Sequence, residues 1–451
     1  VVTPIFRTPP SGSPRPPGEG QWVGDALRPE ETGRGDSPQL VAFFGTICHV
    51  ADIGGRPFST DARELYEEGL FIPITHLFRG GVPNEELLRI VRANVREPDS
   101  VVGDLHAMAT SNDVGGARLL EFLEEFDLPS IIPLADEVIA RSEQAMRDAI
   151  LRVPDGMYRH SLTMDGYSEP GRPGEPDREV PITLACTITV TGDTLHIDFD
   201  GTSPVAPRGI NVVMNYTHAY STFAIRSCLN PDLPNNHGSL APIKISAPKG
   251  SIVNCEYPAP VNARHVVGMY VPMPILKALY HVMPERVLAE GAGAVWTMQI
   301  QGKHDNGRAF TSSMFNYSGG MGARRTKPGP SATCYPTGVA AVPVEILEAA
   351  MPIVFDRKEL RLGSGGAGRA RGGDGQVIQF HMRTEYPWTL NAVPSRLGAG
   401  PEGLEGGMSG AGGHFRVNGK DVSEARKITL KPEDVVVLET PGGGGYGLPG
   451  T

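Results

Sequence analysis

Two short segments of the sequence place acidic and imidazole side chains close enough to share a site. The sharper one reads CHVADIGG at residues 48–55 and follows an apolar run. His49 and Asp52 lie three residues apart, so both side chains can point into one cleft from a turn, and imidazole is a common metal ligand. The paired glycines allow the backbone to approach a ligand closely. The pattern predicts metal ligation by His49, although a His-x-x-Asp pair also occurs as a purely structural hydrogen-bonded pair.

The second segment holds Asp104 and His106. A carboxylate beside an imidazole can orient the ring and fix its tautomer, which would suit acid–base or metal chemistry. We expect this pair to lie just ahead of a helix at residues 117–126. The alternative interpretation is a cap at the N-terminus of a helix together with a surface histidine.

Common nucleotide-binding and hydrolase motifs are weak or absent. The segment GSGGAG at residues 363–368 matches G-x-G-x-x-G, but RARGG follows it and cannot readily begin a phosphate-binding helix, so we interpret the segment as turns. The sequence contains no Gly-Lys-Ser/Thr phosphate loop and no G-x-S-x-G nucleophile elbow. We therefore expect any ATP site elsewhere, and serine hydrolase chemistry loses support.

The N-terminal third must supply the elements that position these residues. A near-continuous apolar run at 40–48 predicts a buried strand that delivers His49. Helical signals then dominate to residue 150. Asp61 with Glu64 forms a capping-box pattern, Asn84 is a second cap candidate, and apolar periodicity predicts helices at 117–126 and 135–151.

Later segments change character. Alternating apolar residues at 184–190 and 195–199 predict a β-hairpin, and helices are expected near 219–229 and 275–282. After residue 300, β-prone stretches alternate with glycine clusters at 363–375, 398–413 and 442–447. We predict an α+β fold of mixed layers, α-rich towards the N-terminus and β-rich and glycine-rich towards the C-terminus. The expected domains are a metal-motif region with a helical layer (1–152), a mixed α/β region (153–300) and a β-rich region (301–451).

Composition narrows the class of protein. The 451 residues carry a formal net charge of −10 and no marked Lys/Arg run, which argues against nucleic acid and anionic membranes as partners. Five scattered cysteines form no CxxC pair, so a reducing cytoplasm is expected. No apolar stretch approaches the roughly 20 residues of a membrane span. Residues 7–37 are rich in Pro and Gly and predict a long surface loop, and the opening VVTPIF run suggests an element whose beginning lies upstream.

Read together, several segments resemble the hydantoinase B/oxoprolinase family, and they occur in the right order over nearly the whole chain. They are CHVADIGG (48–55), YEEGL (66–70) with Ile72-Pro73, NVR (94–96), GDLHA (103–107), PAPVNAR (258–264), GGMGAR (319–324), PVE (343–345), LRLGSGGAG (360–368), RGG (371–373) and TPGGGGYG (440–447).

The resemblance implies a divalent metal, zinc or manganese, held by His49 together with a His-x-x-Asp motif that would immediately precede Val1. It makes Asp52 a residue that orients a ligand or faces the substrate. Glu68, Asp104 and His106 lie in motifs typical of the family, as does Arg264, and we take Asp52, Glu68, Asp104 and His106 as catalytic candidates.

The resemblance also implies a two-component reaction in a cytoplasmic hetero-oligomer. A partner of the hydantoinase A type would bind ATP and phosphorylate a lactam or enol oxygen, and this chain would complete the hydrolysis of a cyclic amide at its metal. An ATP-dependent carboxylation of a ketone is the alternative within the family. If the chain is not itself an enzyme, the alternative is a noncatalytic structural role in a larger assembly.

Overall fold

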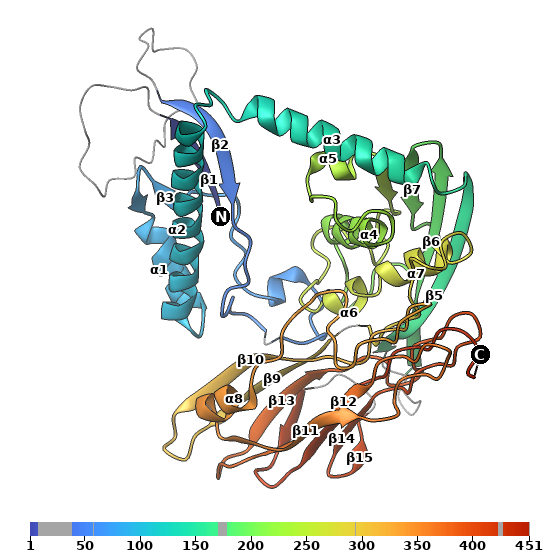
Figure 1. Ribbon diagram of the computed structural model, residues 1–451. Coiled ribbons are helices and arrows are strands. Elements are labelled where there is room, and N and C mark those ends of the chain that lie inside the picture. The colour runs from blue at the N-terminus through green and yellow to red at the C-terminus, as the bar shows by residue number, and fades with distance from the viewer. Residues whose placement is uncertain (8–37, 57, 170–177, 294, 423–426, 451) are drawn as a thin grey trace. The chain divides into compact units, whose positions relative to one another are not determined.

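The chain folds into two compact units. The computed structural model describes residues 1–7, 38–56, 58–169, 178–293, 295–422 and 427–450. Unit 1 comprises residues 1–56 and 68–138, and unit 2 comprises 57–67 and 139–451. Helices and several sheets occur together, so the predicted α+β class is confirmed (Figure 1). The three sequence regions stay a prediction, and the Pro-rich segment lies outside the described residues except for Arg7.

Unit 1 is a strand ribbon beside a long helix. Its elements are β1 (Val2–Arg7), β2 (Gln39–Gly45), β3 (Phe78–Arg79), β4 (Val82–Pro83), α1 (Glu85–Asn94), α2 (Pro98–Glu125) and the first part of α3 (Ile132–Ile150). β1 and β2 pair antiparallel, and α2 runs alongside them in Figure 1. A Cβ on Gly116 of α2 would lie 2.3 Å from Ile5 Cδ1, so glycine at this position lets the helix pack closely on the ribbon.

Three expectations for the N-terminal part of the chain need correction. The strand predicted at 40–48 forms, but it ends at Gly45 and is partly exposed, because a two-stranded ribbon covers neither of its faces fully. The capping pattern at Asp61 begins no α-helix, and only a 3-10 turn forms, at η1 (Leu65–Glu67). The helix predicted at 117–126 is the C-terminal part of α2, which starts at Pro98. Asn84 is confirmed as a cap, since its side chain accepts the Leu87 N–H at 3.2 Å.

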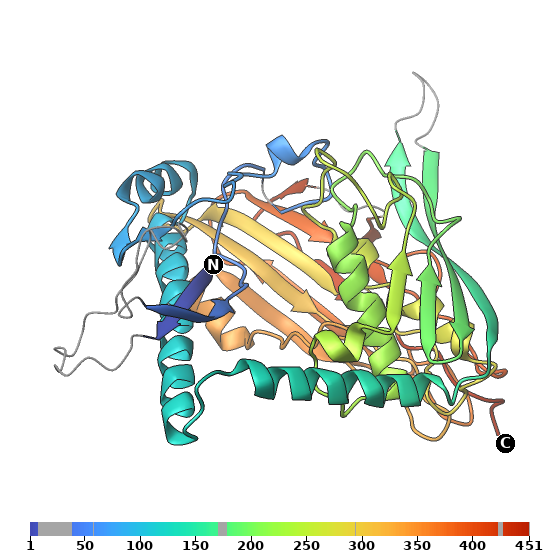
Figure 2. The same cartoon turned by 90° about the horizontal axis from the view of Figure 1, so that it is seen from above.

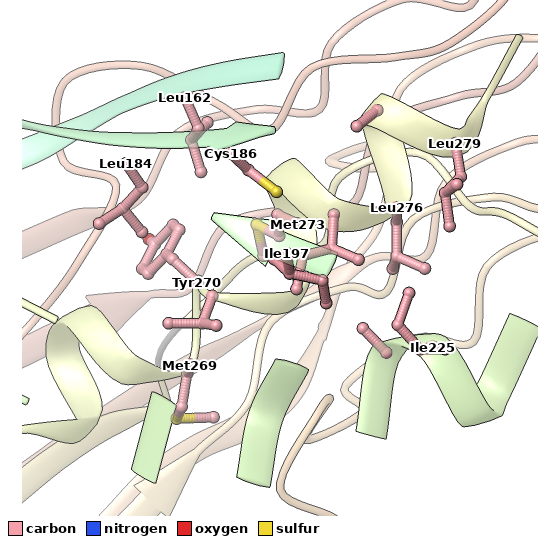
Figure 3. Close-up of a cluster of buried hydrophobic side chains, with 14 of the residues drawn as sticks. Leu162, Leu184, Cys186, Ile197, Ile225, Met269, Tyr270, Met273, Leu276 and Leu279 are labelled. Atoms are coloured by element: carbon pink, nitrogen blue, oxygen red, sulfur yellow. The ribbon is translucent and has the colours of Figure 1, made fainter. Parts of the chain in front are cut away.

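The first layer of unit 2 is a four-stranded sheet covered by helices. Its strands are β5 (Gly156–Glu169), β6 (Arg178–Thr191), β7 (Thr194–Asp198) and β8 (Ile243–Ser246), in that order, and the predicted hairpin is β6–β7. Helices α4 (Met214–Leu229) and α7 (Pro272–Leu279) confirm the two predicted nearby and pack against this layer (Figure 2). Figure 3 shows Met273 and Leu276 of α7 in one apolar cluster with the strand residue Ile197 and with Ile225 of α4. Short helices α5 (His237–Leu240) and α6 (His265–Gly268) lie in the connections.

The second part of unit 2 is β-rich, as predicted. Two sheets, ordered β10-β9-β13-β16 and β11-β12-β17-β14-β15, share one apolar core that includes Trp296, Phe380 and Trp388. The elements are β9 (Trp296–Lys303), β10 (Ala309–Tyr317), α8 (Val344–Ala350), β11 (Ile353–Arg361), β12 (Gly375–Met382), β13 (Trp388–Val393), β14 (His414–Val417), β15 (Lys420–Asp421), β16 (Lys427–Leu430) and β17 (Val436–Glu439). Among the described residues, no helix combines the length and apolar character that a membrane crossing requires.

Glycine-rich loops of unit 2 lie backbone against backbone. A Cβ on Gly320 would lie 1.9 Å from the Gly373 oxygen, and one on Gly443 would lie 2.0 Å from the Met321 oxygen. The segment 363–368 forms turns, as interpreted from the sequence, and the Gly366 N–H donates to the Gly443 oxygen. The glycines are required because any side chain would separate these loops.

A buried carboxylate joins the loops of unit 2 to α7. Glu290 is fully buried and accepts hydrogen bonds at 2.8 Å from both Lys277 Nζ and Arg396 Nη2. The Glu402 N–H also donates to it, at 3.1 Å. The Arg396 guanidinium lies over the Tyr270 ring, 5.1 Å from its centroid, and the Arg396 backbone is left-handed with φ 58°. Such a conformation is costly for a residue with a side chain, so the ion pair and the ring must hold Arg396 in place.

The protonation of Glu290 links this network to pH. Burial alone would raise its pKa, but the charges of Arg396 and Lys277 outweigh burial and hold the pKa below the usual 4.5. A carboxyl with a depressed pKa stabilises the fold above its unfolded pKa and loses that contribution as pH falls through the folded pKa. The stabilisation by Glu290 is therefore complete at neutral pH and is lost only in acid below 4.5.

We predict that Glu290→Gln lowers the free energy of unfolding by about 3–5 kcal/mol, because it leaves the buried Arg396 guanidinium without its anion and Lys277 with only the exposed Glu402 carboxylate. The matched control is Glu402→Gln, which removes a carboxylate that also pairs with Lys277 but has a side chain 65% exposed. That change should cost less than about 1 kcal/mol. Urea denaturation of both variants at neutral pH measures the difference, and equal losses would contradict the assigned role of Glu290.

Candidate functional site

The segment that carries His49 is a loop of unit 1 fixed at both ends. It follows β2, where Thr46 Oγ1 donates to Asn112 Oδ1 of α2 at 2.6 Å. The Asn112 amide nitrogen donates in turn to Thr3 Oγ1 at 3.2 Å, so one buried side chain ties helix, strand and loop together. Val50 packs on the small core around Leu88. The loop that bears His49 is therefore positioned by both polar and apolar contacts.

The paired glycines of the loop permit two close backbone contacts. Gly54 and Gly55 have φ values of 73° and 61°, in the left-handed region that glycine favours. A Cβ on Gly54 would lie 2.1 Å from the Asn94 oxygen, and one on Gly55 would lie 2.4 Å from the Gly69 nitrogen. The adjacent Leu70 N–H donates to the Ile53 oxygen at 2.8 Å. The glycines thus join the loop to the segments around residues 69 and 94, rather than leaving it open towards a ligand.

Asp52 makes an ion pair with Arg96. Its Oδ1 accepts from Arg96 Nη1 at 2.8 Å, its other oxygen accepts the Arg96 backbone N–H, and Arg96 also donates to the Gly55 oxygen. Arg96 lies in the NVR segment that resembles the family, but the sequence predicted no role for it. A partly buried carboxylate in a loop requires a counter-ion, and that requirement is the signal that could have identified Arg96.

Asp104 and His106 contact different parts of unit 1. Both lie inside α2, not ahead of a helix as predicted, and two helical residues at this spacing point in nearly opposite directions. Asp104 Oδ2 accepts the Ala51 N–H at 2.9 Å, so it holds the loop and does not orient the His106 ring. His106 packs edge-on against Phe78 of β3, with ring centroids 5.4 Å apart. The acid–imidazole pair expected from the sequence is therefore not formed.

Glu68 and His49 differ sharply in exposure. Glu68 is buried, directly before the glycine that contacts the loop. His49 is exposed, as is Cys48 beside it, and no described residue forms a hydrogen bond or ion pair with the His49 imidazole. Of the five predicted site residues, the structure brings Asp52 and Asp104 to the His49 loop, places Glu68 beside it and packs His106 against Phe78 of β3.

The described residues do not by themselves make a metal centre. Nowhere among them do three His, Cys, Asp or Glu side chains come together in a way that could hold an ion. Asp52 and Asp104 use their oxygens to bind Arg96 and backbone N–H groups. The arrangement offers one solvent-exposed imidazole on a rigid loop, which can accept a proton or donate one ligand to a metal.

We predict opposite effects for two glycine-to-alanine changes in unit 1. Gly54→Ala should destabilise the protein by more than about 1–2 kcal/mol, the cost of a left-handed residue, because its Cβ would also collide with the Asn94 oxygen. Gly103→Ala lies in α2 with nothing within 4 Å of the new Cβ and should be neutral or stabilising by up to about 1 kcal/mol. Thermal denaturation compares the two, and a harmless Gly54→Ala would contradict the described packing.

Comparisons with known proteins agree on one family. A family model described as hydantoinase B/oxoprolinase matches residues 31–449. A protein of Pseudomonas sp. (strain NS671), named as the B component of a D-/L-hydantoinase, is 31% identical over 432 residues, covering 91% of this chain and 71% of its own. The beta chain of the caprolactamase of Pseudomonas jessenii is 27% identical over 439 residues, covering 90% and 72%.

Solved structures show the same fold. The crystal structure of the ATP-dependent caprolactamase from Pseudomonas jessenii superposes with a TM-score of 0.77 at 24% identity, over 88% of this chain and 70% of that one. The nucleotide-free structure of an acetone carboxylase, a protein of ATP-dependent acetone carboxylation, gives 0.76 at 18% identity over 89% and 60%. At these identities, the two structures establish the fold and leave the reaction open.

Proposed function

Because the chain belongs to the hydantoinase B/oxoprolinase family, we propose that it is one component of an ATP-dependent enzyme that opens cyclic amides. The observation that carries the proposal is that the relatives matched along about nine-tenths of this chain bear the names hydantoinase and caprolactamase. Hydantoin and caprolactam are both cyclic amides. Those relatives are also named as single components of larger enzymes, which supports a hetero-oligomer with a hydantoinase A-type partner that binds ATP.

In the proposed reaction, the partner transfers the terminal phosphoryl group of ATP to the lactam oxygen and releases ADP. Phosphorylation makes the ring carbon more electrophilic, because the phosphorylated oxygen can no longer accept the electron density that the amide nitrogen delocalises onto it. A water adds to that carbon, the ring C–N bond breaks, and the nitrogen takes a proton, which leaves an acyl phosphate. A second water then releases phosphate and the free carboxylate.

We assign His49 as the residue of this chain that faces the reacting group, since its imidazole is exposed and forms no hydrogen bond or ion pair with any described residue. Asp52 and Asp104 act as positioning residues, because their oxygens hold Arg96 and the Ala51 N–H. Catalytic roles for Glu68 and His106 stay predictions. A zinc or manganese ion at His49 also stays a prediction.

The competing reaction is ATP-dependent carboxylation of a ketone, which the acetone carboxylase fold supports. We expect the complex with its ATP-binding partner to consume ATP when given hydantoin, 5-oxoproline or caprolactam, without any need for bicarbonate. The measurement is ADP release with each cyclic amide, and with acetone in the presence and absence of bicarbonate. ATP consumption that requires both a ketone and bicarbonate would replace the hydrolase by the carboxylase.

Metal content tests the role of His49 apart from activity. We predict that the native complex contains stoichiometric zinc or manganese and that His49→Ala loses it, because removing one ligand from a site of about four leaves too few bonds. The matched control is His76→Ala, which removes another exposed imidazole of unit 1. The measurement is elemental analysis of the metal content of three purified complexes, with wild type, His49→Ala and His76→Ala. Full metal retention in His49→Ala would remove His49 from the site, and metal in none of them would favour a purely structural role for the chain.

A further inference from the structure

An arginine of unit 2 carries a charge that no described residue balances. Arg264 ends the PAPVNAR segment and directly precedes α6. Its backbone is held at both ends, since its N–H donates to the Val261 oxygen at 3.0 Å and its carbonyl accepts the Gly268 N–H at 2.9 Å. The residue is half-buried. The start of this side chain is therefore fixed in the fold.

The Arg264 guanidinium has no hydrogen-bonding partner in the described part of the chain. Its one contact of note is with the Tyr216 ring, whose centroid lies 6.0 Å away. Solvent reaches its nitrogens, since none of them is among the buried unpaired atoms. By contrast, Arg208 donates to the Ser168 oxygen and Arg396 to Glu290. Arg264 thus keeps its donors free for a ligand.

Tyr216 supports the guanidinium as a rigid platform. Its ring stacks on that of Tyr220, with centroids 4.7 Å apart and planes 14° from parallel. On its edge it lies against α6, where a Cβ on Gly268 would come within 2.1 Å of Tyr216 Cε1. Only glycine at 268 leaves room for the ring in this position. An arginine held over an aromatic ring in this way loses less freedom when it binds.

The surroundings of Arg264 do not neutralise it. His265 beside it is half-buried, and burial together with the Arg264 charge lowers its pKa to about 4, so the imidazole is neutral at pH 7. Burial raises the pKa of Tyr216 and of Tyr220, which keeps both phenols neutral as well. No carboxylate is among the groups that shift the pKa of these three side chains. Within the described part of the chain, the positive charge of Arg264 therefore has no ionised partner in these three side chains.

We propose that Arg264 is an anion-binding residue that takes the two coplanar oxygens of a carboxylate or a phosphate. The planar fork of a guanidinium matches both groups in a bidentate manner, which an ammonium cannot do. Tyr216 fixes the orientation of the fork, and Gly268 fixes Tyr216. This site lies within unit 2 and requires no particular reaction, so it stands apart from the proposed hydrolysis.

The test is a titration of the full-length chain with inorganic phosphate and, separately, with acetate, followed by NMR line broadening of each anion. We expect saturable binding of at least one anion, and a weakening of about 10- to 100-fold in Arg264→Gln, the loss typical of a hydrogen bond to a charged group. Arg308→Gln is the matched control, because it removes the same charge from an exposed turn between β9 and β10. Tighter binding of phosphate would indicate a phosphorylated ligand, and tighter binding of acetate a carboxylate.

Arg264→Lys separates geometry from charge. It keeps the positive charge and should still bind more weakly than the wild type, because a lysine cannot bind two oxygens in one plane. Circular dichroism of each variant confirms that it folds. Binding unchanged in Arg264→Gln, equal weakening in Arg308→Gln, or no saturable binding of either anion by the wild type would overturn the proposal.

Discussion

A backbone oxygen in contact with a glycine Cα leaves no room for a side chain, and this constraint recurs in both units. In unit 1 it joins Gly54 to Asn94, and a similarly close contact through Gly116 joins α2 to the β1–β2 ribbon. In unit 2 it brings the loops around residues 320, 373 and 443 together. Each contact links segments that are far apart in sequence. The glycine content therefore reflects close packing at the backbone, which fixes the loops that carry the polar residues.

Charged side chains complete what the glycines allow. Asp52 and Asp104 are used in holding the loop after β2, and that arrangement leaves the imidazole of His49 as the free group at its surface. In unit 2, Glu290 gathers two cations and a backbone N–H and so anchors three segments to one point. Arg264 is the opposite case, because the Tyr216 ring lies beside its guanidinium but no described residue supplies a counter-ion. Here the charged groups that have partners stabilise the fold, and those without a partner among the described residues are available to bind ligands.

The fold is shared by proteins named for two different reactions, the opening of a cyclic amide and the carboxylation of a ketone. Both names describe an ATP-dependent reaction. A common scaffold can serve both reactions if the activated substrate meets water in one enzyme and the source of the carboxyl group in the other. Fold alone therefore does not choose between them. The choice rests on the groups that meet the substrate, to which we propose that this chain contributes an exposed imidazole on a rigid loop.

The sequence by itself determined the family, the α+β class, and elements such as the β6–β7 hairpin and helices α3, α4 and α7, because local periodicity records which face of an element is apolar. It also identified the loop of His49 by its residue types. It was wrong about a helix after Asp61, and neither of its two interpretations of Asp104, as a partner of His106 or as a helix cap, holds in the structure. A pattern shows which hydrogen bonds are possible and not which partner wins. Tertiary structure alone decided that Asp52 pairs with Arg96, 44 residues away, and that Asp104 holds Ala51, 53 residues away. Such partners are chosen by chain packing, and spacing along the sequence carries no record of it.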